Sequence, residues 1–147
     1  MAVEKIIEVY TDGSSIRNGQ NDSGCGWACK LIYGNRHKFK SGSDVGKTNN
    51  QMEMIAVLNA ITSITDKSIP VVLYSDSKYV VETLKGNYSI NANEELWMKL
   101  YDEKAKFDDI KFVWVKGHSG NPNNEEVDSL AFNEAMKVEQ DGKQKVN

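Results

Sequence analysis

A short segment near the start of the chain constrains the fold more than any other. Residues 6–11 have strand-like alternation, Asp12 follows them directly, and a Gly-Ser-Ser turn comes next. In open sheets with parallel strands, ligand sites lie outside the carboxyl ends of the strands, so a carboxylate delivered there is a candidate site residue. Standing alone, Asp12 would be more typical of an Asx turn that closes a strand. Its interpretation therefore depends on whether the chain brings other carboxylates to the same place.

Length and composition fit a single globular domain. The 147 residues are 39% hydrophobic and 27% charged, which is enough apolar content for one core. No positively charged n-region followed by an apolar h-region opens the chain, and no apolar run approaches the ~18 residues of a membrane span. We therefore expect a cytoplasmic monomer without membrane contact, with one domain over residues 1–138 and a polar tail over residues 139–147.

The two cysteines fit a reducing compartment. Cys25 and Cys29 lie in one predicted strand, where four residues at ~3.3 Å each separate them by about 13 Å. A disulfide needs Cα atoms within ~7 Å of each other, so this pair is too far apart. We expect both thiols to be reduced, as is usual in the cytosol.

The net charge of the chain leaves its partner undecided. A formal charge of −3 and a pI of about 5.4 argue against a nucleic-acid-binding protein. That argument weakens if several of the acids are metal ligands, because bound divalent cations reverse the local charge.

Strand and helix patterns follow one another in a definite order. Strand patterns occur at residues 6–11, 26–33, 36–41, 71–75 and 110–115. Helical periodicity and capping signals occur at residues 49–62, 77–85, 94–106 and 124–138. Residues 13–24 and 42–47 are rich in small and polar residues and are predicted as loops. We therefore expect an α/β fold with a five-stranded mixed sheet, three antiparallel strands plus two parallel, flanked by helices.

Glu53 lies on the helix stripe that is predicted to face the sheet. At 100° per residue it falls in line with Val57, Ala60 and Ile64. A glutamate in the first helical turn is also a common capping-box or dipole partner. A carboxylate on a buried stripe nevertheless requires a partner or a role, which makes Glu53 a second candidate site residue.

Asp76 and Asp128 repeat these two patterns. Asp76 directly follows the strand pattern at residues 71–75, as Asp12 follows the first strand. Asp128 lies on the side of the last helix that is expected to pack inward. The residues that share this side are Ala131, Phe132 and Ala135. Each aspartate alone is also consistent with a strand-end cap or a helix-dipole partner.

Four carboxylates brought together predict a metal site. They are Asp12, Glu53, Asp76 and Asp128. Paired strands lie ~4.8 Å apart, and like charges at about 4 Å cost several kcal/mol at an intermediate dielectric, so the four acids cannot all stay ionised without cations. Oxygen ligands of this kind suit Mg²⁺ or Mn²⁺. Two such ions about 4 Å apart activate a water and stabilise the leaving oxygen of an in-line phosphoryl displacement.

A different phosphate-related motif nearly appears in the middle of the chain. The segment Gly42-Ser43-Asp44-Val45-Gly46-Lys47-Thr48 lies between a strand and a helix, as the phosphate loop of a P-loop nucleotidase does. A phosphate loop has four residues between its glycines, whereas this segment has three, so its backbone amides do not form the same cradle. A P-loop interpretation also leaves Asp12, Glu53 and Asp128 without roles.

Four motifs give the chain a family likeness. In order they are Thr11-Asp12-Gly13-Ser14, Thr48-Asn49-Asn50-Gln51-Met52-Glu53, Tyr74-Ser75-Asp76-Ser77, and Val115-Lys116-Gly117-His118-Ser119-Gly120 followed by Asn124-Glu125-Glu126-Val127-Asp128. In order, spacing and predicted secondary structure, these residues resemble type 1 ribonuclease H, and the likeness covers about residues 4–136. The resemblance implies metal-dependent endonucleolytic cleavage of the RNA strand of an RNA/DNA hybrid, with 5′-phosphate and 3′-hydroxyl ends.

The resemblance also implies roles for individual residues at the site of the reaction. The ligands of two divalent cations, Mg²⁺ or Mn²⁺, would be Asp12, Glu53, Asp76 and Asp128. His118, on a glycine-flanked loop, would assist proton transfer or product release. Glu125 would support the site from behind the metal ligands.

For substrate binding, the resemblance implies contacts to both strands of a hybrid. The residues that would read RNA in the minor groove are Asn18, Asn49 and Asn50. The residues that would contact the DNA strand are Thr48 and Asn93, at a phosphate, and Tyr79 beside the strand.

Two departures from the family pattern concern hybrid binding. Gly46 stands, beside Lys47, where some members place an arginine in the DNA-phosphate pocket. Residues 85–93 form a short link where many cellular members insert a basic helix and loop, and no separate N-terminal hybrid-binding module is expected. We therefore predict weak hybrid binding with strong salt dependence. A catalytically silent nucleic-acid-binding domain on the same fold stays as an alternative, although all four acids are present.

Overall fold

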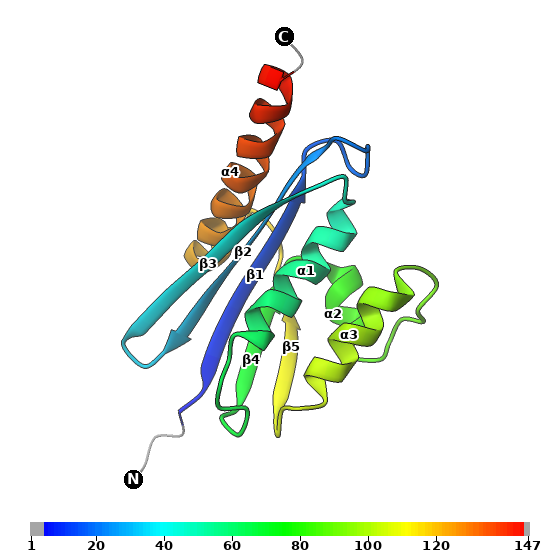
Figure 1. Ribbon diagram of the computed structural model, residues 1–147. Helices are drawn as coiled ribbons and strands as arrows, with labels where there is room; N and C mark the ends of the chain where they lie inside the picture. The colour runs from blue at the N-terminus through cyan, green and yellow to red at the C-terminus, as the bar shows by residue number, and fades with distance from the viewer. Residues whose placement is uncertain (1–4, 146–147) are drawn as a thin grey trace.

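Five strands form one mixed sheet in the order β3-β2-β1-β4-β5 (Figure 1). The computed structural model describes residues 5–145, so residues 1–4 and 146–147, at the ends of the predicted domain and tail, lie outside the described residues. The strands are β1 (Ile7–Ser15), β2 (Gly24–Tyr33), β3 (Arg36–Val45), β4 (Val71–Ser75) and β5 (Ile110–Trp114). Strands β1, β2 and β3 pair antiparallel, whereas β4 and β5 run parallel to β1. The predicted mixed sheet is confirmed.

Helices cover both faces of this sheet. They are α1 (Asn49–Thr62), α2 (Lys78–Leu84), α3 (Glu94–Lys104) and α4 (Pro122–Lys145). The first three lie on one face, and α4 lies on the other against β1, β2 and β3 (Figure 1). No helix within residues 5–145 has the length and apolar character that crossing a membrane requires.

Alternation along β1 divides the core into two layers. Val9 joins the larger apolar cluster, which also includes Leu73 and fills the space under α1, α2 and α3. Tyr10 belongs to a smaller cluster that includes Ala131 on α4. Because successive side chains of a strand point to opposite faces, Asp12 is directed to the same face as Tyr10, where α4 lies.

Three strands are longer than the sequence pattern predicts, because β2 also begins early, at Gly24 and not at residue 26. β1 continues through the Gly-Ser-Ser segment to Ser15, and β3 continues to Val45, so the predicted loops at residues 13–24 and 42–47 are wrong at these positions. The added residues pair with the start of β2. Backbone pairing supplies this order without apolar alternation. The same pairing excludes a phosphate loop at residues 42–48, because its first half is strand.

Helix α4 is also longer than predicted. It continues to Lys145 and does not end near Val138. Glu139 is buried, although residues 139–147 are predicted as a polar tail. The close contact of Glu139 with Gly24 on β2 favours helix beyond residue 138, and local composition does not reveal this contact.

The predicted inward position of Phe132 is wrong. Its side chain is 50% exposed, whereas Val127, Ala131 and Ala135 are buried. These three buried residues are spaced by four, so the contact stripe is narrow, and Phe132 lies about 100° around the helix from Ala131. Small residues on this stripe let α4 lie close to the sheet.

Candidate active site

Two parallel strands deliver Asp12 and Asp76 to the same place. β1 and β4 pair in parallel up to Thr11 and Ser75, so Asp12 and Asp76 are the next residues on adjacent strands. Neighbouring strands lie ~4.8 Å apart, which brings the two carboxylates close together. Only Asp76 follows the end of its strand, because β1 continues past Asp12 along β2.

Helix α1 adds Glu53 because the backbone at Gly13 leaves room for it. A Cβ built on Gly13 would lie 2.2 Å from the backbone carbonyl carbon of Met52, so only glycine allows α1 this close to β1. The Gly13 N–H donates to Glu53 Oε1 at 2.6 Å, and Ser75 Oγ donates to Glu53 Oε2 at 3.4 Å. The Glu53 carboxylate is therefore held between β1 and β4.

The carboxylates of Asp12, Glu53 and Asp76 form one tight cluster. One oxygen from each residue lies within 4.8 Å of the other two. Asp12 is 4% exposed, Glu53 is 7% exposed, and Asp76 is half-buried. No Lys or Arg among residues 5–141 forms an ion pair with any of the three. The cluster therefore gathers three carboxyl groups away from water with no described basic side chain to pair them.

Burial and mutual repulsion oppose ionisation of this cluster. Burial raises the pKa of Asp12, and the neighbouring Glu53 raises it further. Burial also raises the pKa of Glu53, and burial followed by the charge of Asp128 raises the pKa of Asp76. A donor set made only of carboxylate oxygens that repel one another fits Mg²⁺ or Mn²⁺, because a divalent cation favours the ionised form of each ligand.

Asp128 borders the cluster but is not one of its three members. Its oxygens lie outside the set that shares the 4.8 Å spacing, yet its side chain acts on the pKa of both Asp12 and Asp76. Helix α4 delivers it from the opposite side of the sheet to Glu53. The structure thus brings three of the four predicted ligands together and places the fourth at their edge.

His118 reaches the same edge from the loop between β5 and α4. Its side chain is 83% exposed, and its Nδ1 lies 4.0 Å from Asp128 Oδ2, which is too far for a hydrogen bond. Its backbone has a φ of 55°, a left-handed conformation that is uncommon outside glycine. A Cβ on the preceding Gly117 would lie 3.0 Å from Asp76 Oδ2, so this loop passes directly over the acids.

The predicted RNA-reading asparagines lie together at the start of α1. Asn18 Oδ1 accepts a hydrogen bond from the Asn49 N–H at 2.9 Å, and Asn49 Oδ1 accepts one from the Ser15 N–H at 2.8 Å. These bonds fix the orientation of both side-chain amides. Neither Nδ2 group, nor the exposed Asn50 side chain, makes a hydrogen bond with other described residues.

A chain of hydrogen bonds joins the predicted DNA-contact residues. Thr48 caps α1 by accepting from the Gln51 N–H at 3.1 Å, and Gln51 Nε2 donates to Asn93 Oδ1 at 3.1 Å. Asn93 Nδ2 donates to the Tyr79 hydroxyl at 3.4 Å, which also accepts from Trp97 Nε1 at 3.0 Å. Gln51 is absent from the predicted substrate residues, although the Thr-x-x-Gln capping-box spacing was a visible signal for it.

Two other positions lie apart from these clusters. Glu125 is exposed and lines a hollow with Phe39 and Leu130. Among the described residues, no hydrogen bond or ion pair links its side chain to the carboxylate cluster. Lys47, next to the glycine that replaces an arginine of the family pattern, lies with its Nζ 3.7 Å from Asp44 Oδ1. Its charge is therefore partly offset.

Comparisons with known proteins agree on one family. A family model described as RNase H matches residues 4–136. A Ribonuclease H of Campylobacter concisus is 36% identical over 147 residues, which cover 95% of this chain and 99% of that protein. A Ribonuclease HI of Helicobacter pylori is 40% identical over 139 residues, which cover 89% of this chain and 94% of that protein. The solved N-terminal RNase H domain of a Mycobacterium tuberculosis protein has the same fold, with a TM-score of 0.83 at 18% identity over 94% of this chain and 99% of that chain.

Proposed function

This chain belongs to the ribonuclease H family, and on that premise we propose that it hydrolyses the RNA strand of RNA/DNA hybrids. The proposed products carry 5′-phosphate and 3′-hydroxyl ends. The observation that carries the proposal is the cluster of Asp12, Glu53 and Asp76, whose oxygens lie within 4.8 Å of one another. Such a cluster is costly unless it holds cations, and a pair of cations so held is suited to in-line displacement at a phosphodiester.

The proposed cofactor is a pair of divalent cations, Mg²⁺ with Mn²⁺ as the alternative. The residues that would hold them are Asp12, Glu53, Asp76 and Asp128. When bound, such ions activate a water and stabilise the leaving oxygen of an in-line displacement. The protein contributes orientation: the Gly13 N–H holds Glu53, and the register of β1 with β4 sets Asp12 beside Asp76.

His118 is proposed to move a proton at the departing 3′-oxygen or to help the product leave. Imidazole is the side chain best suited to exchange protons near neutral pH. The exposure of His118 and its place beside Asp128 support this role. Glu125, one helical turn before Asp128, is proposed to support the site through its charge without touching the metal.

The surface beside the acids is proposed to bind both strands. The unpaired amide donors of Asn18 and Asn49 suit the acceptors of the minor groove and the 2′-hydroxyl of RNA, and Asn50 lies next to them. For the DNA strand, Thr48 and Asn93 are proposed to hold a phosphate, with Tyr79 beside it. The N-terminus of α1 at Thr48 favours an anion there, because its backbone N–H groups and dipole are positive.

We also propose that the protein acts as a monomer in the cytoplasm. Cys25 and Cys29 are both buried and form no disulfide, as predicted, which suits a reducing compartment. Light scattering of the purified protein tests the oligomeric state, and a dimer mass would contradict the first part of this proposal.

The proposed function is tested by incubating the purified protein with end-labelled RNA/DNA hybrid, duplex RNA and duplex DNA, each with Mg²⁺, Mn²⁺ or EDTA. We expect cleavage of the hybrid alone, only with metal, and with 5′-phosphate ends. Cleavage of all three substrates would point to a nonspecific nuclease. Binding of the hybrid without any cleavage would instead support a catalytically silent domain.

A further inference from the structure

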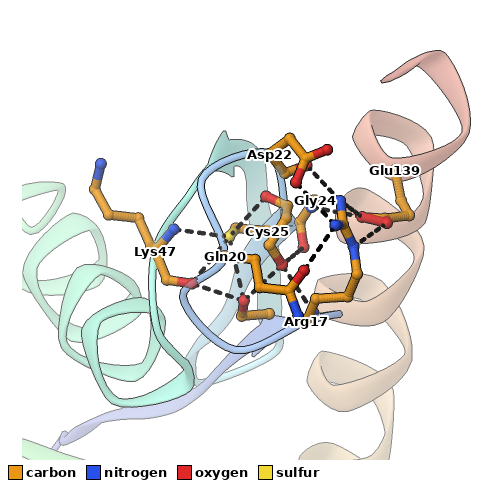
Figure 2. Close-up of polar contacts among 9 residues, drawn as sticks. Arg17, Gln20, Asp22, Gly24, Cys25, Lys47 and Glu139 are labelled. Carbon is orange, nitrogen blue, oxygen red and sulfur yellow. Dashed lines mark hydrogen bonds and ion pairs between the residues drawn. The ribbon is translucent and has the colours of Figure 1, made fainter. Parts of the chain in front are cut away.

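A buried carboxylate ties helix α4 to the loop between β1 and β2. The Glu139 side chain is 4% exposed, and its Oε1 accepts a hydrogen bond from Arg17 Nε at 2.6 Å. Its Oε2 accepts from the Gly24 N–H at 2.8 Å. Figure 2 shows the Arg17 guanidinium facing Glu139, which projects from α4. Hydrogen bonds between charged groups are about twice as strong as neutral ones, so this contact restrains the loop.

The Arg17 guanidinium also contacts other residues of the loop between β1 and β2. Arg17 Nη1 donates to Gln20 Oε1 at 3.0 Å and pairs with Asp22 Oδ1 at 2.8 Å. Arg17 Nη2 donates to the Asp22 carbonyl oxygen at 2.9 Å (Figure 2). The Arg17 backbone N–H donates to Ser23 Oγ at 2.8 Å. One residue therefore links α4 to several points of the loop.

Glycine at the start of β2 places Glu139 next to this loop. A Cβ on Gly24 would lie 2.3 Å from the Ala135 carbonyl oxygen and 2.6 Å from the Glu139 nitrogen, so α4 rests directly on the strand. The contact also requires α4 to continue to residue 139, which lies beyond residues 4–136 that match the family model. Arg17 and Gly24 lie within the matched segment, so only the Glu139 side of this contact lies beyond it.

The opposite side of the loop is joined to the proposed substrate surface. Ser15 Oγ donates to the Lys47 carbonyl oxygen at 2.7 Å, just before α1, and lies 2.9 Å from Ser23 Oγ. Asn18, within the loop, accepts from the Asn49 N–H at 2.9 Å and has a φ of 41°. The loop thus connects Glu139 on α4 with the start of α1.

We propose that Arg17 and Glu139 are positioning residues for substrate recognition, which hold the loop so that Asn18 stays against Asn49 with its amide donor facing the RNA strand. This inference rests on the proposed function and deepens it. The carboxylate cluster has its own supports from Gly13 and the sheet. Loss of the pair therefore affects substrate binding and leaves the chemical step in place.

The test compares Glu139→Gln with the wild-type protein on one RNA/DNA hybrid in Mg²⁺, with KM and kcat measured separately. This variant keeps the side-chain size and removes the charge. We expect KM to rise about threefold to tenfold while kcat stays within about twofold, as for the loss of an interaction that serves binding alone. Hydrogen exchange of the backbone amides of residues 18–23 should become faster.

Glu134→Gln is the matched control. Glu134 lies on the same helix but contacts Ser43 and Lys137 and does not touch the loop. This substitution should leave both KM and loop exchange unchanged.

Further variants separate positioning from general stability. In an Asn18→Ala background, Glu139→Gln should raise KM no further, because the pair acts through Asn18. Arg17→Gln removes the other charge of the pair and should raise KM as Glu139→Gln does, and the double substitution Arg17→Gln with Glu139→Gln should raise KM no further than either single substitution.

The outcomes are distinguishable. Faster hydrogen exchange in the loop with an unchanged KM would overturn the positioning role. Unchanged hydrogen exchange would overturn the claim that Arg17 and Glu139 restrain the loop. If Glu139→Gln does not fold, Arg17→Lys serves for the same comparison, because it keeps the charge and loses the planar guanidinium. If the wild-type protein does not cleave the hybrid, the proposed function fails, whereas loop exchange still tests whether the pair restrains Asn18.

Discussion

The Gly13 N–H and Glu53 Oε1 lie 2.6 Å apart, across the contact between β1 and α1. This hydrogen bond is possible because glycine carries no side chain at a point where a Cβ would strike the Met52 backbone. Gly13 directly follows Asp12, so one backbone contact sets the relative position of two acids. The geometry of the carboxylate cluster therefore depends on a residue that has no functional group.

Substitution Gly13→Ala should disrupt both stability and activity. The added methyl group meets backbone at 2.2 Å, which a side-chain rotation cannot relieve. We expect a loss of unfolding free energy of roughly 1–3 kcal/mol or more, as for overpacked cores, and hybrid cleavage reduced at least about tenfold. Urea denaturation and a cleavage assay measure the two effects. The neighbouring Ser14→Ala is the control, expected within about 0.5 kcal/mol of wild type, and a wild-type-like Gly13→Ala would contradict the close-approach argument.

Substitution Asp12→Asn should abolish cleavage while leaving the fold intact. Removing one carboxylate from the crowded acids relieves their repulsion in the metal-free protein, so the melting temperature in EDTA should rise. A labelled hybrid and thermal denaturation provide the two measurements. Asp102→Asn, an exposed acid on α3, should change neither quantity. Full activity of Asp12→Asn would refute its assignment as a ligand, and a lower melting temperature without metal would refute the repulsion.

The stability of the metal-free protein should carry a pH dependence from the same acids. Burial raises the pKa of Asp12, Glu53 and Asp76 in the folded state. Above the ordinary carboxyl pKa of about 4, the folded protein therefore holds more protons than the unfolded chain, and the unfolding free energy falls as the pH rises. In EDTA, the gain in melting temperature from Asp12→Asn should be larger at about pH 8 than at about pH 5. An equal gain in melting temperature at both pH values would show that ionisation of the cluster does not cause the gain.

Substitution His118→Ala should slow turnover without weakening substrate binding. The imidazole lies at the exposed edge of the site, beside Asp128, where the proposed proton donor would reach a leaving group. We expect kcat to fall about 10- to 100-fold with little change in KM, at the low end of general acid–base effects. The other histidine of the chain, His37 on β3, offers the control His37→Ala, which should behave as wild type. A rise in KM alone would assign His118 to binding.

Hybrid binding should be weak and salt-dependent. The link at residues 85–93 carries one lysine, and the charge of Lys47 is partly offset by Asp44, so little positive charge faces the phosphate backbone and the affinity should be low. Binding is measured with the Asp12→Asn variant, so that cleavage does not interfere. We expect the affinity to fall as the salt rises from about 0.05 M to about 0.2 M, because salt weakens the contacts to phosphates. A nanomolar dissociation constant at the higher salt concentration would contradict this prediction.

Local patterns were sufficient to predict the mixed sheet and the three acids that the structure brings together. Asp12 and Asp76 follow strand patterns with a period of two, and Glu53 falls on a helical stripe with a period of 3.6. Each of these signals lies within one element, because backbone geometry sets the period. The mixed sheet followed from the order of the elements.

Packing between elements decided features that no single pattern contains. The ends of β1 and β3 are strand because β2 pairs with them, although their own residues are polar. The position of Asp128 at the edge of the cluster and the exposure of Phe132 both follow from how α4 lies across the sheet. These outcomes depend on where a whole helix sits, and periodicity predicts only which face it buries.

Arg17 and Glu139 show most clearly what local sequence patterns do not predict. They are separated by 122 positions in the sequence, and each alone is an ordinary charged residue in a polar segment. Their side chains meet because α4 packs directly against Gly24, which places Arg17 Nε 2.6 Å from Glu139 Oε1. The sequence by itself determined the elements and the acids that they carry, because those depend on local geometry. The tertiary structure decided which side chains meet, because that depends on the packing of segments far apart in the chain.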